Sequence, residues 1–135
     1  MRLRATTGDI VDRALGDTSP VVRRRCAELA ASLEGVDLLP LLTDDDAGVV
    51  EAACFGLGEL ADARAVAPLC RIAAEHADAL CRESAVAALG SIGEPAGLPT
   101  ILAALSDRPA VRRRAVIALA PFSGPSVDEA LHRAL

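Results

Sequence analysis

A short segment recurs along this chain with a period of roughly 30 residues, and this repeat constrains the fold more than any other feature. The clearest copy is VRRRAVIALA at residues 111–120. Related segments read VRRRCAELAA at 22–31, VVEAACFGLG at 49–58 and CRESAVAALG at 81–90. Because such a period is typical of stacked helical units, the repeat predicts an all-α solenoid.

Helix start and stop signals divide the chain into about four units after a short capping helix at 9–16. The units are expected at about 17–42, 43–75, 76–105 and 106–135, which makes one domain of the whole chain. Each unit should contain a longer first helix and a shorter second helix. Pro68 lies deeper in its second helix than Pro40 or Pro99, so it should kink that helix or shift its start.

Apolar residues make up 52% of the chain but aromatic residues only 1%, so Ala, Leu and Val must form most of the core. Small and unbranched side chains of this kind suit closely stacked helices. Helical spacing predicts which side chains face inward. In the capping helix and the first helices these include Ile10, Val11, Ala14, Leu15, Val22, Cys26, Leu29, Leu57, Leu60, Leu80, Cys81, Ala85, Leu89, Ala115, Leu119 and Phe122. In the second helices they include Val36, Leu38, Leu39, Leu41, Leu42, Leu69, Ile72, Ile101, Val127, Leu131 and Leu135.

The net charge of −5 gives the chain an acidic character, and it contains no Trp or Tyr. A general nucleic-acid binder needs a basic footprint, and base stacking needs aromatic side chains. The N-terminal residues lack the apolar run of a signal peptide, and no uncharged stretch is long enough to cross a bilayer. We therefore expect a cytoplasmic protein without a membrane segment.

No pattern of catalytic or metal-binding residues is evident. Four cysteines, at 26, 54, 70 and 81, have no CxxC pairing, which favours small buried residues with free thiols over redox or metal chemistry. Asp44, Asp45 and Asp46 precede a helix, where N-capping and the helix dipole explain them better than a cation does. His76 and His132 lie in polar segments that favour solvated helix ends. We expect neither an enzyme nor a cofactor.

The repeated pattern of a turn Asp, V-R-x-x-A-x-x-A-L-G, a Gly or Pro turn and a short L-P-x-L helix resembles the HEAT-repeat family. The short units are similar to its phycobilisome-lyase type, over nearly the whole chain. The resemblance implies a right-handed superhelix of antiparallel helix pairs, whose second helices line a concave face that holds partners. It also implies a ladder in which the motif Arg pairs with the turn Asp of a neighbouring unit. The matching positions are Asp17, Arg23, Asp44, Arg82, Asp107 and Arg112.

Two positions depart from the ladder pattern. In the second unit Val50 stands where the other units have Arg, and in the third unit His76 lies near the turn position, so the ladder should be interrupted there. The three residues of each triplet, Arg23–Arg25 and Arg112–Arg114, span most of a helical turn and cannot all share one helix face. We expect most of them to be solvated, with a phosphate-binding patch as the sharper alternative.

The favoured function is a non-enzymatic module or scaffold that binds another protein. Side chains expected to face the partner from the second helices are Asp37, Arg64, Arg71, Glu75, Thr100, His132 and Arg133. Their mixed charges favour a polar protein surface over a polyanion. Two other classes stay open, namely a bilin-lyase-like enzyme or accessory subunit, and a nucleic-acid-binding protein. Weak head-to-tail self-association, with Arg triplets of one copy against Asp44–Asp46 of another, is a further hypothesis.

Overall fold

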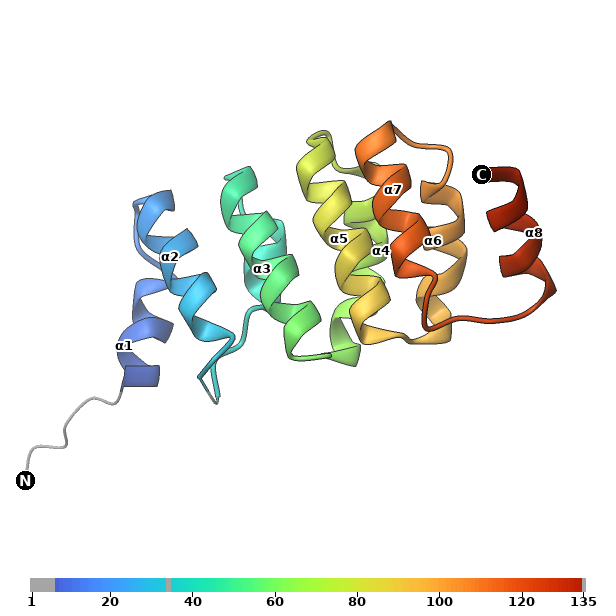
Figure 1. Ribbon diagram of the computed structural model, residues 1–135. Coiled ribbons are helices and arrows are strands. Elements are labelled where there is room, and N and C mark those ends of the chain that lie inside the picture. Colours follow the sequence, from blue (N-terminus) through green and yellow to red (C-terminus); the bar gives the residue numbers. More distant parts are fainter. Residues whose placement is uncertain (1–6, 34, 135) are drawn as a thin grey trace, which may run out of the picture.

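The helices stack side by side into an α-solenoid, as the repeat predicts (Figure 1). The structure is a computed structural model that describes residues 7–33 and 35–134, and these residues contain helices and no strand. The first-helix layer consists of α2 (Pro20–Ala30), α3 (Ala47–Glu59), α5 (Ala79–Ile92) and α7 (Pro109–Ala118). The second helices are η1 (Leu39–Thr43), α4 (Val66–Glu75), α6 (Leu98–Ala104) and α8 (Pro125–Ala134). Helix α1 (Thr7–Ala14) precedes α2, and the single 3₁₀ turns η2 (Ala63–Ala65) and η3 (Pro95–Gly97) lead into α4 and α6.

Aspartate side chains cap several helices at their N-termini. Asp46 accepts a hydrogen bond from the backbone N–H of Val49 at 3.1 Å and begins α3, and Asp78 accepts one from Leu80 at 2.8 Å and begins α5. These bonds satisfy N–H groups that have no partner inside the helix. Part of the acidic cluster at 44–46 therefore has a capping role. Asp9, by contrast, lies inside the first turn of α1 and does not precede it.

Glycines let neighbouring first helices approach closely. A Cβ atom at Gly58 of α3 would lie 3.0 Å from the Cα atom of Ala88 in α5. A Cβ atom at Gly90 of α5 would lie 2.7 Å from the Cα atom of Ala118 in α7. The Leu-Gly pair that closes two of the repeats thus supplies a buried leucine and, beside it, a position where the next helix contacts the backbone.

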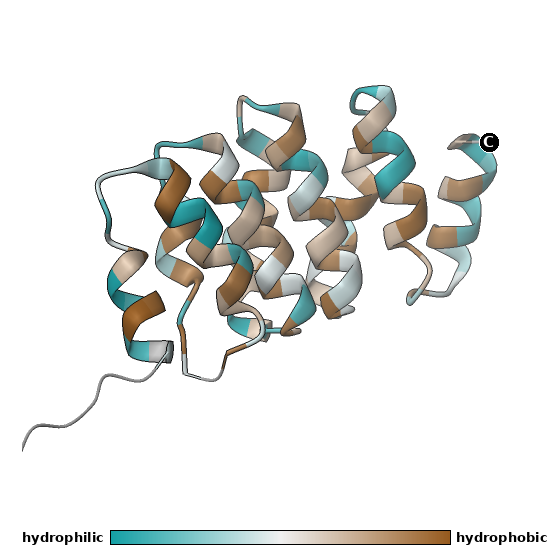
Figure 2. Ribbon diagram, turned by 60° about the vertical axis from the view of Figure 1, so that its left-hand side comes forward, coloured by the Kyte–Doolittle hydropathy of each residue, from teal (hydrophilic) through white to brown (hydrophobic). Residues whose placement is uncertain are grey.

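The buried side chains form one apolar core that runs between the two sets of helices. Figure 2 shows hydrophobic and hydrophilic stretches alternating along each helix, as expected when one side of a helix faces its neighbours. Most predicted core residues are buried, including Leu57, Leu89 and Leu119. No polar or charged residue is buried among the described residues.

Several side chains predicted to face inward are exposed instead. They are Ile10, Val22, Leu29, Leu60 and Leu80. In α2 the buried residues are Ala27 and Ala30, because α2 approaches α3 through small side chains near Gly56. Leu60 is the C-cap of α3, beyond its packed face, and Leu80 lies one position before the buried stripe that begins at Cys81. Cys26, Phe122 and Leu131 are only partly buried, and Leu135 lies outside the described residues.

The second helices also differ in part from the prediction. In the first unit only the 3₁₀ helix η1 forms, and Val36 and Leu38 reach the core from the preceding loop. The alternatives stated for Pro68 are resolved by a shifted start. Helix α4 begins at Val66 after the separate turn η2, so Pro68 lies in its first turn, where a missing N–H is tolerated.

Candidate partner-binding surface

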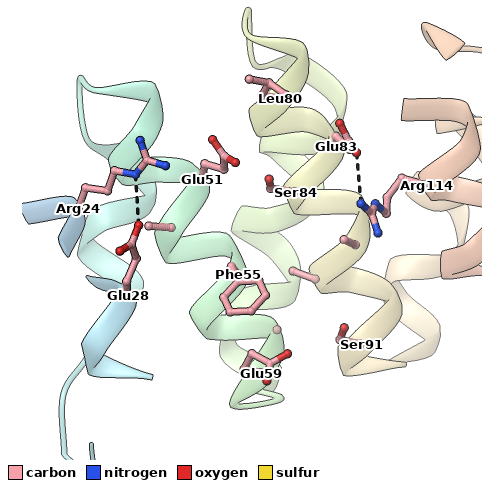
Figure 3. Close-up of a pocket in the computed structure, with 14 residues that line it drawn as sticks. Arg24, Glu28, Glu51, Phe55, Glu59, Leu80, Glu83, Ser84, Ser91 and Arg114 are labelled. Atoms are coloured by element: carbon pink, nitrogen blue, oxygen red, sulfur yellow. Dashed lines mark hydrogen bonds and ion pairs between the residues drawn. The ribbon is translucent and has the colours of Figure 1, made fainter. Parts of the chain in front are cut away.

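A hollow of about 610 Å³ opens on the outer side of the first-helix layer (Figure 3). Its lining comes from α2, α3, α5 and α7, so it crosses three successive contacts between first helices. The other hollows are smaller, at about 410, 300 and 470 Å³, and lie among the second helices or at the connecting turns. The first-helix hollow is therefore the largest of these four.

The wall from α3 carries one aromatic side chain between two carboxylates. Glu51, Phe55 and Glu59 follow each other at i, i+4 spacing, so they share one face of the helix. Most other residues of α3 are buried against α2, α5 and the second helices, which leaves this stripe pointing outward. Phe55 is 64% exposed, although the chain contains only two phenylalanines. An exposed aromatic of this kind is typical of an interaction surface.

Across the hollow, α5 supplies Leu80, which is 57% exposed, and the half-buried Ser84. Much of the remaining lining consists of small residues, among them Ala52, Gly58 and Ala87. These positions cannot fill the space with side chains of their own. The hollow is thus a consequence of the same small residues that allow α3 and α5 to pack closely.

The charges of the hollow are unevenly paired. Arg24 pairs with Glu28 on α2, and Arg114 of α7 pairs with Glu83 of α5, each at 3.3 Å. Both arginines are therefore occupied by glutamates that also line the hollow (Figure 3). Glu51 and Glu59 form no ion pair within the described ranges. With four glutamates against two arginines, the lining carries an excess of negative charge.

The residues predicted to face a partner from the second helices lie in separate places. Arg64 binds Asp62 at 2.8 Å and approaches Asp37 at 3.6 Å at the connecting turns. Arg71 and Glu75 of α4 line a smaller hollow against η1. Arg133 lines the hollow between α6 and α8 and lies 3.8 Å from Glu129, while His132 is exposed on α8 and Thr100 half-buried on α6. The structure thus brings Arg64 near Asp37, and Arg71 and Glu75 into one hollow, but forms no single continuous site from the predicted residues.

Sequence reasoning did not single out the Phe55 stripe. The signal was present as E-x-x-x-F-x-x-x-E at 51–59, since a large apolar residue between charges at i−4 and i+4 must share their solvated face.

Arg23 and Arg82 each connect two successive units through the same set of bonds, called a joint below. The Nε and Nη2 atoms of Arg23 donate to the two carboxylate oxygens of Asp44 at 2.8 and 3.0 Å, and its Nη1 donates to the backbone carbonyls of Asp17 and Thr18. Arg82 makes the equivalent bonds to Asp107, at 2.9 and 3.0 Å, and to the carbonyls of residues 76 and 77. Each arginine thus ties its own turn to the next unit through bidentate, charge-assisted bonds.

The side chains of the other two ladder residues, Asp17 and Arg112, take no part in these joints. Asp17 accepts the backbone N–H of Ser19 at 2.8 Å, while Asp17 and Arg112 are exposed and form no ion pair within the described residues. His76 takes the place of a turn aspartate, because its Nδ1 atom accepts the backbone N–H of Asp78 at 3.0 Å. It offers no carboxylate, and Val50, at the arginine position of the second unit, is buried.

One contact between units therefore differs from its neighbours. Ion pairs join the first unit to the second, through Arg23–Asp44 and Arg64–Asp37, and the third to the fourth, through Arg82–Asp107 and Arg114–Glu83. Within the described residues no ion pair crosses from the second unit to the third. Packing of α3 and α4 on α5, packing of α4 on α6, and a bond from the Cys81 thiol to the Ala47 carbonyl at 3.3 Å make that contact.

The two joints should make stability depend on acidic pH. Hydrogen bonds from Arg82 and Arg23 lower the pKa of Asp107 and of Asp44 below the ordinary aspartate value. A carboxylate with a depressed pKa stabilises the fold fully above its unfolded pKa, about 4, and loses this effect as pH falls through the folded pKa. We expect the urea concentration at the unfolding midpoint to decrease once the pH drops below about 5. Asp107→Asn should lower the midpoint at pH 7 and make it depend less on pH.

Asp12→Asn is the matched control, because Asp12 is exposed and forms no ion pair within the described residues. It should leave both the midpoint and its pH dependence unchanged. Urea unfolding followed by circular dichroism from pH 7 to the acid limit measures both variants. Equal curves for wild type and Asp107→Asn would contradict a stabilising role for the joint.

The cysteines offer little nucleophilic or metal-binding chemistry. All four are free thiols. Burial raises the pKa of the Cys54 thiol to about 12 and that of Cys81 to about 11, which keeps both protonated and unreactive. Cys26 and Cys70 are half-buried, so the prediction of small buried residues holds fully only for Cys54 and Cys81. Among the described residues, no group of three or more His, Cys, Asp or Glu has the arrangement of a metal site.

Comparison with known proteins gives one finding. A family model for HEAT repeats matches residues 7–87 and, in an overlapping second match, residues 35–120. These matches cover most of the chain and most of both sets of helices. The match is to HEAT repeats in general and does not distinguish the short phycobilisome-lyase type. No curated protein matches the chain. In the part of the chain that the structure describes, no helix has the length and apolarity to cross a membrane.

Proposed function

Because this chain belongs to the HEAT-repeat family, whose members commonly bind other proteins, we propose that it is a non-enzymatic module that binds a partner protein in the hollow of its first-helix layer. The observation that carries this proposal is Phe55. Phe55 is 64% exposed in the largest of the four hollows, beside small residues that leave room for a partner. Interfaces place such aromatic anchors in contact with their partners, where they contribute much of the binding free energy.

The surface predicted from the second helices is the competing location for the same function. Its charged groups are partly occupied with one another, as in the pairs Arg64–Asp62 and Arg133–Glu129. The hollows there are smaller than the first-helix hollow. Exposed ion pairs of this kind contribute little to binding. These comparisons favour the first-helix hollow.

The test is recovery of a bound protein from a nuclease-treated lysate of the native host by the tagged chain, followed by affinity measurement with the purified partner. Truncating Phe55 and Leu80 together to alanine should weaken binding by at least about 30-fold, the effect of losing an interface anchor of about 2 kcal/mol. Ile117→Ala is the matched control, since Ile117 is 63% exposed but lies outside the hollow.

Three other results would place the partner elsewhere on the chain or contradict a protein partner. Binding that survives truncation of Phe55 and Leu80 but is lost in Arg64→Glu/Arg71→Glu would place the partner on the second helices. Equal loss in the Ile117→Ala control would place it elsewhere on the first helices. Salt-sensitive binding of duplex DNA, with no protein recovered, would contradict the proposed function altogether.

A further inference from the structure

We infer that the hollow receives an amphipathic α-helix of a partner protein, with one large apolar side chain between two Lys or Arg side chains. This inference rests on the proposed function and adds the chemical class of the partner. It follows from the shape of the hollow and from its charge.

The shape is that of a shallow groove bounded by two helices. The outward stripe of α3, through Glu51, Phe55 and Glu59, forms one side, and the stripe of α5 through Leu80 and Ser84 forms the other (Figure 3). The residues between them are small, so a partner backbone can approach closely. An amphipathic helix docked by its apolar face is the occupant that such a groove between helices fits.

The charge selects the partner's polar side chains. Phe55 lies one helical turn from Glu51 and one from Glu59, and these two carboxylates have no ion-pair partner within the described residues. Their Cα atoms are about 12 Å apart along the axis of α3, from a rise of about 1.5 Å per residue. A partner helix along the groove meets both when cationic side chains lie about two turns apart, on either side of its apolar anchor. Glu28 and Glu83 extend the negative lining at the margins.

A second copy of the chain fits this requirement less well. Exposed apolar side chains lie near arginines on α2 and α7, which are the nearest internal candidates. Ile117 has Arg113 one turn before it, but the position one turn after it is Pro121, beyond the end of α7. Val21 has Arg25 one turn after it, but Asp17 one turn before it. Neither helix supplies two cations around one anchor.

The experiment selects ligands without assuming their sequence. A displayed library of random peptides, long enough for several helical turns, is panned against the folded chain, and enriched peptides are synthesised with a fluorophore for anisotropy titration. We expect Lys or Arg on both sides of a Leu, Phe or Met in the enriched set. Affinity should fall at least about 10-fold in Glu51→Lys/Glu59→Lys and should weaken with added salt.

The matched control is Asp12→Lys/Glu94→Lys, which changes the net charge equally at two exposed carboxylates outside the hollow. It should keep at least most of the affinity. Circular dichroism and thermal unfolding verify that both double variants remain folded, and Phe55→Ala gives a second variant without charge change.

Other outcomes overturn the inference. Enriched peptides that are acidic or uncharged, equal losses in both double variants, or no enriched peptide at all would each contradict it. Sedimentation showing self-association that Glu51→Lys/Glu59→Lys abolishes would identify a second copy as the occupant. Peptides that depend on Arg64 and Arg71 would overturn the inference but leave the proposed interaction function standing, whereas failure to recover any partner protein bears on that function alone.

Discussion

Leu89→Ala is expected to lower the free energy of unfolding by about 2–5 kcal/mol, the range for truncating a fully buried leucine. Leu89 is 1% exposed in α5, which packs against α3, α4, α6 and α7. Its Cδ2 atom lies close to Gly97 in the turn that leads into α6. The substitution therefore leaves a cavity where the first helices, the second helices and a connection meet. Urea or thermal unfolding followed by circular dichroism measures the loss.

Leu80→Ala on the same helix is the control, because Leu80 is 57% exposed and its truncation removes little buried surface. Its effect on stability should stay within about 0.5 kcal/mol, although the proposed function predicts weaker partner binding. Comparable losses of stability in the two variants would show that α5 does not pack as the structure has it.

The second large effect is expected from Gly90→Ala, which should be destabilising by about 1–3 kcal/mol. In a helix without close neighbours this change should instead be stabilising, by about 1 kcal/mol, because alanine favours the helical backbone. At Gly90 the new Cβ atom would lie 2.7 Å from both the Cα and the Cβ atoms of Ala118. The obstacle includes backbone, so α5 and α7 must move apart. Thermal unfolding of the variant measures the net result.

The comparison for this prediction is Gly16→Ala. A Cβ atom at Gly16 would meet only the Arg13 carbonyl, at 3.6 Å, which is an ordinary contact. That variant should unfold close to the wild type. A stabilised Gly90→Ala variant would mean that α5 and α7 are farther apart than in the structure. It would contradict the role of the terminal glycine of the repeat in their close approach.

The sequence predicted the architecture well because the repeat is a local pattern that each unit must satisfy by itself. The alternation of first and second helices, the aspartate caps and the core leucines Leu57, Leu89 and Leu119 all follow from spacing and turn chemistry. The exposed Leu29 and the 3₁₀ helix η1 did not follow. Whether a side chain at the edge of a helical stripe is covered depends on how close the next unit lies, and that distance is a tertiary property.

The candidate site was less predictable for a related reason. A HEAT-like pattern implies two surfaces, and the resemblance favoured the second helices. The position of the first-helix hollow depends on how closely small residues let α3 and α5 approach, and on how few large side chains project outward around Phe55. Neither property is a motif. Both arise only when the helices are placed side by side.

The contact that no ion pair crosses has a mechanical consequence. Two pairs of units are each held by polar joints, which keep fixed angles and distances, and the pairs meet through the packing of α3 and α4 on α5 and of α4 on α6. Apolar contacts are not directional, so small rotations there cost less than rotations that break a bidentate bond. We therefore expect the second and third units to rotate against each other more easily than the units on either side of them. Since the first-helix hollow spans that contact, a bound partner would restrict the rotation and set the curvature of the solenoid.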